Sequence, residues 1–184
     1  MEKKLVIAGF GGQGVMLAGE LLSEAGKEEE KYVTFLPSYG PEMRGGTANC
    51  DVIVSDDPIA SPIIANPEAA IIMNLPSLDK FEPLMKEDGI LILNKTLIPK
   101  EVQRKDVRVL GIDALTIAKE LGNEKVTNLI LLGAYVTVEK TVSLETLKNA
   151  LKVFLKGKKE KLIPINEKAL DKGAEVAKEF LGEK

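Results

Sequence analysis

The residues best suited to bind a charged ligand form a glycine-rich turn directly after an apolar run. Gly9, Gly11 and Gly14 have the G-x-G-x-x-G spacing, and the residues after them have helical periodicity. Glycine permits a tight turn and close approach of a ligand, while free N–H groups at the helix start attract an anion. Such glycines also serve simply to shape a strand-to-helix turn. Gly12 and Gln13 favour the binding interpretation, because they add bare backbone and a polar amide.

The acidic residue that would complete a nicotinamide-dinucleotide site is absent from its usual position. In such sites an Asp or Glu at the end of the second strand, about 20 residues after the glycines, binds the ribose 2′-hydroxyl. The second predicted strand, Tyr32–Leu36, is followed instead by Pro37–Gly40, and Glu28–Glu30 precede it at the wrong end. We therefore expect no NAD binding.

A second group of chemically active residues follows that strand, in a predicted loop over residues 37–46. It offers a hydroxyl, an aromatic ring, a carboxylate, a guanidinium and several glycines: Ser38, Tyr39, Gly40, Pro41, Glu42, Met43, Arg44, Gly45, Gly46 and Thr47. Ligands of α/β sheets bind at the carboxyl ends of the strands, where this loop is expected. An arginine beside a glycine-rich helix start suits a phosphate, although Glu42 and Arg44 would also suit an exposed ion pair with each other.

The order of apolar runs and helical patterns predicts an α/β fold. Strands are expected over residues 4–8, 32–36, 47–55, 69–74, 89–94 and 106–112. Helices are expected over residues 15–27, 77–85, 113–121, 126–139, 143–155 and 166–181. This alternation is typical of a Rossmann-like, doubly wound, mostly parallel sheet with helices on both faces, here with a helical C-terminal third. We expect residues 1–184 to form a single domain.

The composition excludes several classes of chemistry. The chain has no histidine, which excludes His-based triads, and its one cysteine, Cys50, cannot supply a zinc site or an iron–sulfur cluster. We expect Cys50 to be buried, and we expect no catalytic residue and no metal site. The net charge of −3 argues against general nucleic-acid binding. Met1–Lys4 is too short and polar to open a signal peptide, so we expect a cytoplasmic protein without membrane contact.

Together, the two glycine-containing motifs resemble those of one family. The stretches Gly9–Val15 and Ser38–Thr47, with Ala48–Ser55 and Met73–Leu78, are similar to the gamma subunit of 2-oxoacid:ferredoxin oxidoreductases. The resemblance implies CoA-dependent oxidative decarboxylation of a 2-oxoacid to its acyl-CoA, with electrons passed to ferredoxin. It also implies alpha, beta and, in some assemblies, delta partner subunits, which hold thiamine diphosphate, magnesium and the iron–sulfur clusters.

The resemblance further implies a coenzyme A site. Its residues match the two motifs: Gly11, Gly12, Gln13, Gly14 and Val15 in the first, and Ser38, Tyr39, Gly40, Arg44, Gly45 and Gly46 in the second. In this hypothesis the N–H groups around Gly12 to Val15 bind a phosphate of CoA and Arg44 adds positive charge. Tyr39 and Gly40 shape the wall toward the catalytic subunit.

Several alternatives stay open at the level of sequence. The second motif is most similar to the 2-oxoglutarate branch, followed by branched-chain 2-oxoacid enzymes, with pyruvate and indolepyruvate enzymes as further options. Two other functions are also compatible with the sequence. One is a structural scaffold subunit whose glycine loops contact neighbouring subunits, and the other is a stand-alone nucleotide-binding protein. The role of Asn128, in an apolar run that predicts a buried helix, is also open: it would cap a backbone group, contact the ligand or pair with a neighbouring subunit.

Overall fold

The computed structural model describes residues 1–40, 46–157 and 159–183. Six strands among these residues form one sheet: β1 (Glu2–Phe10), β2 (Tyr32–Tyr39), β3 (Thr47–Ser55), β4 (Ala69–Ile72), β5 (Ile90–Asn94) and β6 (Arg108–Ile112), in the order β2-β3-β1-β4-β5-β6. β1, β4, β5 and β6 pair in parallel, whereas β3 is antiparallel to both of its neighbours, β1 and β2. The α/β class is confirmed, and the sheet is mixed because β2 and β3 form a hairpin.

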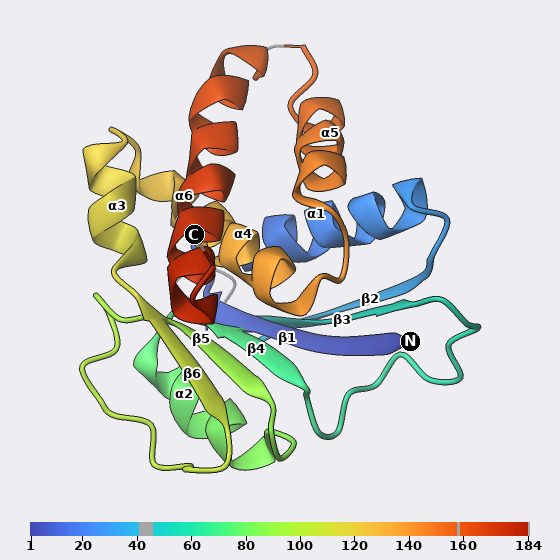
Figure 1. Ribbon diagram of the computed structural model, residues 1–184, viewed down its shortest axis with the longest axis vertical. Helices are drawn as coiled ribbons and strands as arrows, with labels where there is room; N and C mark the ends of the chain where they lie inside the picture. Colours follow the sequence, from blue (N-terminus) through green and yellow to red (C-terminus); the bar gives the residue numbers. More distant parts are fainter. Residues whose placement is uncertain (41–45, 158, 184) are drawn as a thin grey trace.

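Helices cover both faces of this sheet, as predicted (Figure 1). They are α1 (Val15–Glu28), α2 (Leu75–Phe81), α3 (Ala114–Glu120), α4 (Thr127–Glu139), α5 (Leu144–Phe154) and α6 (Ile163–Leu181), with short 3-10 helices at Glu82–Leu84, Glu124–Val126 and Glu160–Leu162. Along β1, Leu5 and Ile7 pack into the core that includes α1 and α4, while Val6 and Ala8 pack into a smaller core with α2. None of the described helices is long and apolar enough to cross a membrane.

The second strand is longer than the sequence predicts. A loop was expected from Pro37, but β2 continues through Pro37, Ser38 and Tyr39, which pair with Cys50, Asn49 and Ala48 of β3. β2 lies at the edge of the sheet, where a proline is tolerated because one side of the strand needs no backbone donor. Ser38 and Tyr39 are therefore exposed strand residues.

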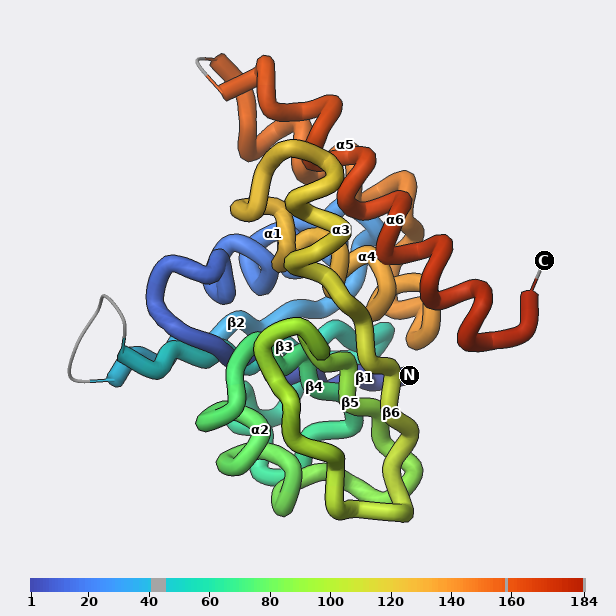
Figure 2. The backbone as a smooth tube through the Cα atoms, turned by 90° about the vertical axis from the view of Figure 1, so that its left-hand side faces the viewer, coloured from blue at the N-terminus to red at the C-terminus, as the bar shows by residue number. Residues whose placement is uncertain are grey.

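The helix predicted to be apolar all round is α4, and its central part is buried. Much of its cover comes from α6, which crosses it outside the sheet (Figure 2). Two glycines set the closeness of this crossing, since a β-carbon on Gly133 would overlap the carbonyl of Leu170, and one on Gly173 would overlap that of Ile130. Helix α6 of the same chain thus covers much of the apolar surface of α4.

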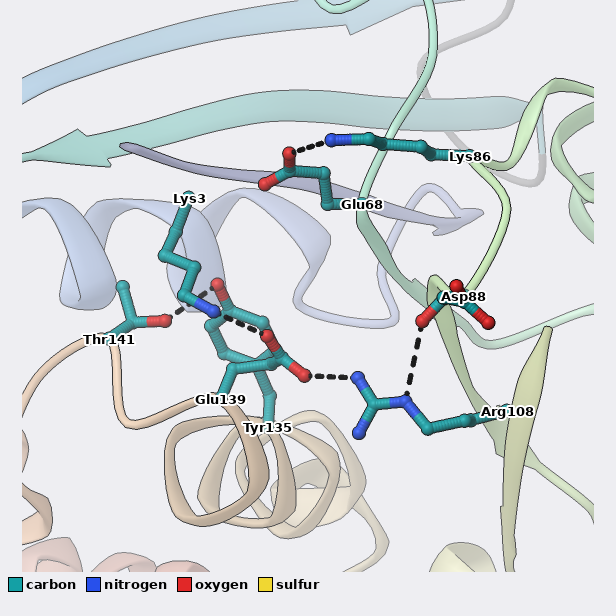
Figure 3. A network of polar contacts seen from close by, with 8 residues as sticks. All are labelled: Lys3, Glu68, Lys86, Asp88, Arg108, Tyr135, Glu139 and Thr141. Atoms are coloured by element: carbon teal, nitrogen blue, oxygen red, sulfur yellow. Dashed lines mark hydrogen bonds and ion pairs between the residues drawn. The ribbon is translucent and has the colours of Figure 1, made fainter. Parts of the chain in front are cut away.

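A network of charged residues joins the end of α4 to the sheet, at the edge opposite the carboxyl ends of the parallel strands (Figure 3). Glu139 accepts hydrogen bonds from Lys3 Nζ at 2.8 Å and from Arg108 at 2.7 Å, so one carboxylate connects α4 with β1 and β6. Nearby, the buried Tyr135 hydroxyl accepts a hydrogen bond from Thr141 Oγ1 at 2.8 Å. These contacts fix the position of α4, whose other end lies at the candidate site.

Candidate functional site

The glycine-rich turn contacts one described residue of the second motif, Gly46. β1 ends at Phe10, and the N–H of Gly11 donates to the carbonyl of Gly46 at 2.9 Å. Gly46 immediately precedes β3, so the hairpin of β2 and β3 brings the second motif to the end of β1. The expectation that the two motifs meet at one edge of the sheet is thereby confirmed for these two glycines.

The turn has a backbone conformation that requires glycine at two positions. Gly12 has a φ of 100° and Gly14 a φ of 77°, both in the region that side chains with a β-carbon rarely adopt. A β-carbon on Gly12 would meet no atom within 4 Å, so the backbone here borders open space. One on Gly14 would overlap the Asn128 side chain. The two glycines therefore have different roles: Gly12 leaves access to the backbone and Gly14 permits a close contact.

Gln13 has an internal role in this turn. Its Oε1 accepts a hydrogen bond from the N–H of Phe10 at 2.6 Å, and its Nε2 donates to the carbonyl of Met73 at 3.4 Å. The side chain thus ties the turn to the ends of β1 and β4. Gly9 leaves room for it, since a β-carbon there would lie 2.6 Å from Gln13 Oε1. Gln13 also lines the cleft, and Nε2 has a second N–H that neither bond uses, so the predicted ligand contact stays a prediction.

Asn128, whose role the sequence left open, bonds to a backbone group of the glycine turn. It is 1% exposed, and its Nδ2 donates to the carbonyl of Gly14 at 3.0 Å. The contact fixes the peptide from which α1 starts, and it joins the N-terminal ends of α1 and α4. The only signal in the sequence was a single amide at the start of an apolar helix, which gives no indication of its partner 114 residues away.

The start of α1 offers unpaired backbone donors. Gly14 is the N-cap, no side chain caps the helix, and its first turn holds no acidic residue. The N–H groups of the first turn have no acceptor within the helix, and among the described residues no acceptor lies within hydrogen-bond range of the N–H of Gly12 or Gly14. These donors and the helix dipole together favour an anion at this position.

A cleft of about 270 Å³ opens beside the turn. Its lining includes Gly12, Gln13, Met73 after β4, Asn94 at the end of β5, Leu115 in α3 and Lys125 before α4. The cleft thus lies at the carboxyl ends of the parallel strands. From β1 the chain continues into α1 on one face, and from β4 into α2 on the other (Figure 1). Open α/β sheets bind ligands at such a switch between faces.

The residues of the second motif are not all brought to this cleft. Ser38 and Tyr39 do not line it, and Tyr39 is 52% exposed on the edge strand. The N–H of Gly40 donates to the carbonyl of Thr47 at 2.8 Å, which closes the base of the hairpin. Arg44 and Gly45, both predicted to line the site, lie outside the described residues. Of the second motif, Gly46 has the direct bond to the glycine turn.

The described residues contain no evident nucleophile or metal site. Cys50 is buried as expected, and burial raises the pKa of its thiol to about 12, so the thiol stays protonated. In the part of the chain that the structure describes, no three His, Cys, Asp or Glu side chains come together in a way that would hold a metal ion. The cleft lining carries one charge of each sign, on Glu124 and Lys125, so its preference for an anion rests mainly on the backbone donors of the glycine turn.

Comparison with known families identifies the family to which the chain belongs. A family model described as pyruvate ferredoxin/flavodoxin oxidoreductase matches residues 4–176, nearly the whole chain. The chain belongs to this family. The match includes both glycine motifs and every strand except the first two residues of β1.

Two relatives in the pyruvate ferredoxin/flavodoxin oxidoreductase family cover almost all of this chain. The ketoisovalerate oxidoreductase subunit VorA of Methanothermobacter marburgensis is 37% identical over 181 residues, 98% of this chain and 37% of that protein. The 2-oxoglutarate synthase subunit KorC of Methanocaldococcus jannaschii is 35% identical over 184 residues, 98% of this chain and 96% of that subunit. The chain thus spans little more than a third of VorA and nearly all of KorC.

A solved structure has the same fold. The gamma subunit of the keto/oxoacid ferredoxin oxidoreductase from Geobacter sulfurreducens superposes with a TM-score of 0.82 and 30% identity, covering 95% of this chain and 98% of that subunit. The mixed sheet with its helical C-terminal region is therefore the gamma-subunit fold of this family.

Proposed function

We propose that residues 1–184 act as a single gamma-type domain of a multi-subunit 2-oxoacid:ferredoxin oxidoreductase, and that the cleft beside the glycine turn binds part of CoA. The observation that carries this proposal is the uncapped N-terminus of α1, which lies behind a glycine turn at the carboxyl edge of the sheet. Backbone donors in that geometry suit a phosphate of CoA. The N–H groups of Gly12, Gly14 and Val15 are the proposed contacts, with Lys125 at the cleft wall.

The size of the cleft supports a shared binding site. Small-molecule sites commonly enclose about 300–1,000 Å³, and this cleft of about 270 Å³ is below that range. It would therefore hold one portion of a CoA molecule, while the rest extends across a subunit interface. Arg44 and Gly45 remain predicted contacts. Gly11 and Gln13 use their backbone or side-chain groups within the turn and would shape the site.

The chemistry of the reaction is assigned to other subunits in this proposal. Thiamine diphosphate with magnesium would supply carbanion stabilisation, and iron–sulfur clusters would carry electrons to ferredoxin. This chain has one cysteine, whereas a cluster is usually held by four, so its residues do not fit a cluster. The partners that would hold these groups are the alpha and beta subunits of the proposed complex, with a delta subunit in some assemblies.

The position of β2 argues against a stand-alone dinucleotide-binding protein. In a dinucleotide-binding fold β2 lies next to β1, so that the acid at its end reaches the ribose. Here β3 lies between β1 and β2, and the residues that end β2 are Ser38 and Tyr39. The acid is thus missing, and the strand that would carry it is displaced by one position in the sheet.

A structural role in subunit contact is a second proposed function of the same chain. Tyr32, Leu36 and Tyr39 are 51%, 39% and 52% exposed along the edge strand β2. Exposed aromatic and aliphatic side chains next to the ends of a hairpin suit a protein interface. A scaffold role of this kind is compatible with CoA binding at the neighbouring cleft.

The proposed 2-oxoacid is 2-oxoglutarate. The support is the amino-acid sequence of the second motif, together with a relative named for 2-oxoglutarate that matches along nearly its whole length. The test is to purify the native complex that contains this chain and to assay CoA-dependent viologen reduction with 2-oxoglutarate, pyruvate and 2-oxoisovalerate. Turnover with 2-oxoglutarate above the other two supports the proposal. Higher turnover with another acid would contradict the proposed substrate but not the proposed activity. If none of the three acids supports turnover, the proposed activity is contradicted.

A further inference from the structure

We infer that Asn94 is a ligand-recognition residue, whose side-chain amide binds a ligand group that presents one hydrogen-bond donor and one acceptor side by side. The inference rests on the proposed function, since it concerns the same cleft. Asn94 is the last residue of β5 and lines the same cleft as Gly12 and Gln13 of the glycine turn. It belongs to neither glycine motif, so no residue pattern in the sequence drew attention to it.

The Asn94 side chain is buried without a partner. The residue is 0% exposed, and neither Oδ1 nor Nδ2 has a hydrogen-bond partner among the described residues. Its carbonyl, by contrast, accepts from the N–H of Leu97 at 3.0 Å. Buried polar groups in folded proteins nearly always have a partner, so an amide with both ends free calls for a specific explanation.

The other buried asparagines each have a bond within the fold. Asn74 Oδ1 accepts from the N–H of Ser77 and so caps α2. Asn128 Nδ2 holds the carbonyl of Gly14, and Asn166 Nδ2 donates to the carbonyl of Leu162 at 2.6 Å. Among the four, Asn94 alone has no side-chain bond to the described part of the chain. Its amide therefore has no evident structural task.

The surroundings of Asn94 suit recognition of a ligand. Met73, Leu97 and Leu115 line the same cleft and give it apolar walls, within which a hydrogen bond is stronger than in open water. The cleft also reaches Gly12, whose backbone borders open space. A ligand bound by the N–H groups of the glycine turn would therefore pass close to the Asn94 amide.

The chemistry of an amide defines the partner group. An asparagine side chain offers one acceptor and two donors, which match a secondary amide or the adenine edge that presents N6 and N7. CoA contains both: amides in its pantetheine arm and adenine in its nucleotide. The shared chemistry is a neighbouring donor and acceptor, and fragments of CoA distinguish its two sources.

The test is binding to the assembled complex, measured by calorimetry with wild type and Asn94→Leu. Leucine has a similar volume and no unpaired polar atoms, so we expect the complex to assemble and to melt at the same temperature or higher. The dissociation constant of CoA should rise at least tenfold. Pantetheine and adenosine 3′,5′-bisphosphate are then titrated separately, and the fragment whose binding is weakened identifies the group that Asn94 binds.

Asn166→Leu is the matched control. Asn166 is also a buried asparagine, but its amide is bonded within the fold, so its replacement should lower the melting temperature and leave CoA binding unchanged. If the complex with Asn94→Leu does not assemble, Asn94→Ser is used instead. Serine replaces the amide by a single, shorter hydroxyl that cannot form the paired hydrogen bonds, so the same loss of affinity is expected. Equal CoA affinity in wild type and the Asn94 variant would overturn the inference. A wild-type complex that does not bind CoA would instead contradict the proposed function.

Discussion

At the scale of single residues, the site depends on Gly14 and Asn128. Gly14 has a positive φ and no room for a β-carbon, and Asn128 occupies the space beside it and bonds to its carbonyl. The start of α1 is thereby held in place without a capping side chain. An exposed turn of this shape would otherwise have little to fix the direction of its N–H groups.

Replacing Gly14 by alanine tests this contact. The positive φ alone costs roughly 1–2 kcal/mol for a residue with a β-carbon, and overlap with Asn128 adds to this, so we expect a loss of about 3 kcal/mol in the free energy of unfolding. Gly157→Ala is the control, because Gly157 has a φ of 84° and no atom within 4 Å of an added β-carbon. Denaturant unfolding of both variants gives the comparison, and equal losses would show that Asn128 exerts no constraint.

At the scale of helices and strands, α4 links the site to the rest of the fold. Its first turn contacts the glycine turn through Asn128, its middle packs under α6, and its last residue, Glu139, bonds to β1 and β6. A change at either end of α4 is therefore expected to reach the cleft through one rigid helix.

The packing of α4 under α6 gives a prediction at this scale. Gly173→Ala would place a β-carbon against the Ile130 carbonyl, and backbone cannot move aside as a flexible side chain can. We expect a loss of about 3 kcal/mol in the free energy of unfolding. Gly111→Ala in β6 meets atoms only at 3.5 Å or beyond, so it should change stability by less than about 0.5 kcal/mol. Similar stability of the two variants in denaturant would contradict this view of the crossing.

We predict that stability depends on pH through Glu139, the last residue of α4. Burial opposes ionisation of Glu139, but hydrogen bonds from Lys3 and Arg108 outweigh it, so the pKa of this carboxyl lies below its ordinary value of 4.5. The unfolded chain then takes up the proton first, so the stabilisation is complete above about pH 4.5 and is lost as the pH falls through the lower pKa of the folded state.

Glu139→Gln removes this effect. The variant should lose about 1–2 kcal/mol in the free energy of unfolding near pH 7, and its stability should fall less steeply below about pH 4.5 than that of wild type. Denaturant unfolding across this pH range measures both quantities. An unchanged pH dependence would mean that the Glu139 carboxylate in the network of Figure 3 contributes no net stabilisation.

The elements of the fold were largely predictable from sequence, and their pairing was not. The bounds of β3 agree with the apolar run over residues 47–55, and α1 begins at Val15 as the glycines indicated. The extension of β2 through Pro37 was missed, because proline in a strand is acceptable only at a sheet edge and the edge is set by tertiary structure. Asn94 and Asn128 were not predicted as site residues for the same reason, since single amides carry no pattern until folding brings them to the glycine turn.

At the scale of the whole molecule, the chain has the gamma-type fold of the pyruvate ferredoxin/flavodoxin oxidoreductase family. The cleft, the uncapped start of α1 and the hairpin that carries the second motif lie at one end of the sheet. The described residues bring backbone donors, Lys125 and Glu124 to this end, without an evident nucleophile or a cluster of metal ligands. This arrangement fits a subunit that binds CoA for a reaction whose chemistry takes place in its partners.

The central claim is tested most directly by Gly12→Ala in the purified complex. The new β-carbon would point into the open space where CoA is proposed to bind, while Gly157→Ala carries a similar backbone strain outside the cleft. The measurement is the KM for CoA in viologen reduction. We predict a rise of about tenfold or more for Gly12→Ala, equivalent to at least about 1.4 kcal/mol of lost binding, and no change for Gly157→Ala. Equal KM values for both variants and wild type would contradict CoA binding at the glycine turn.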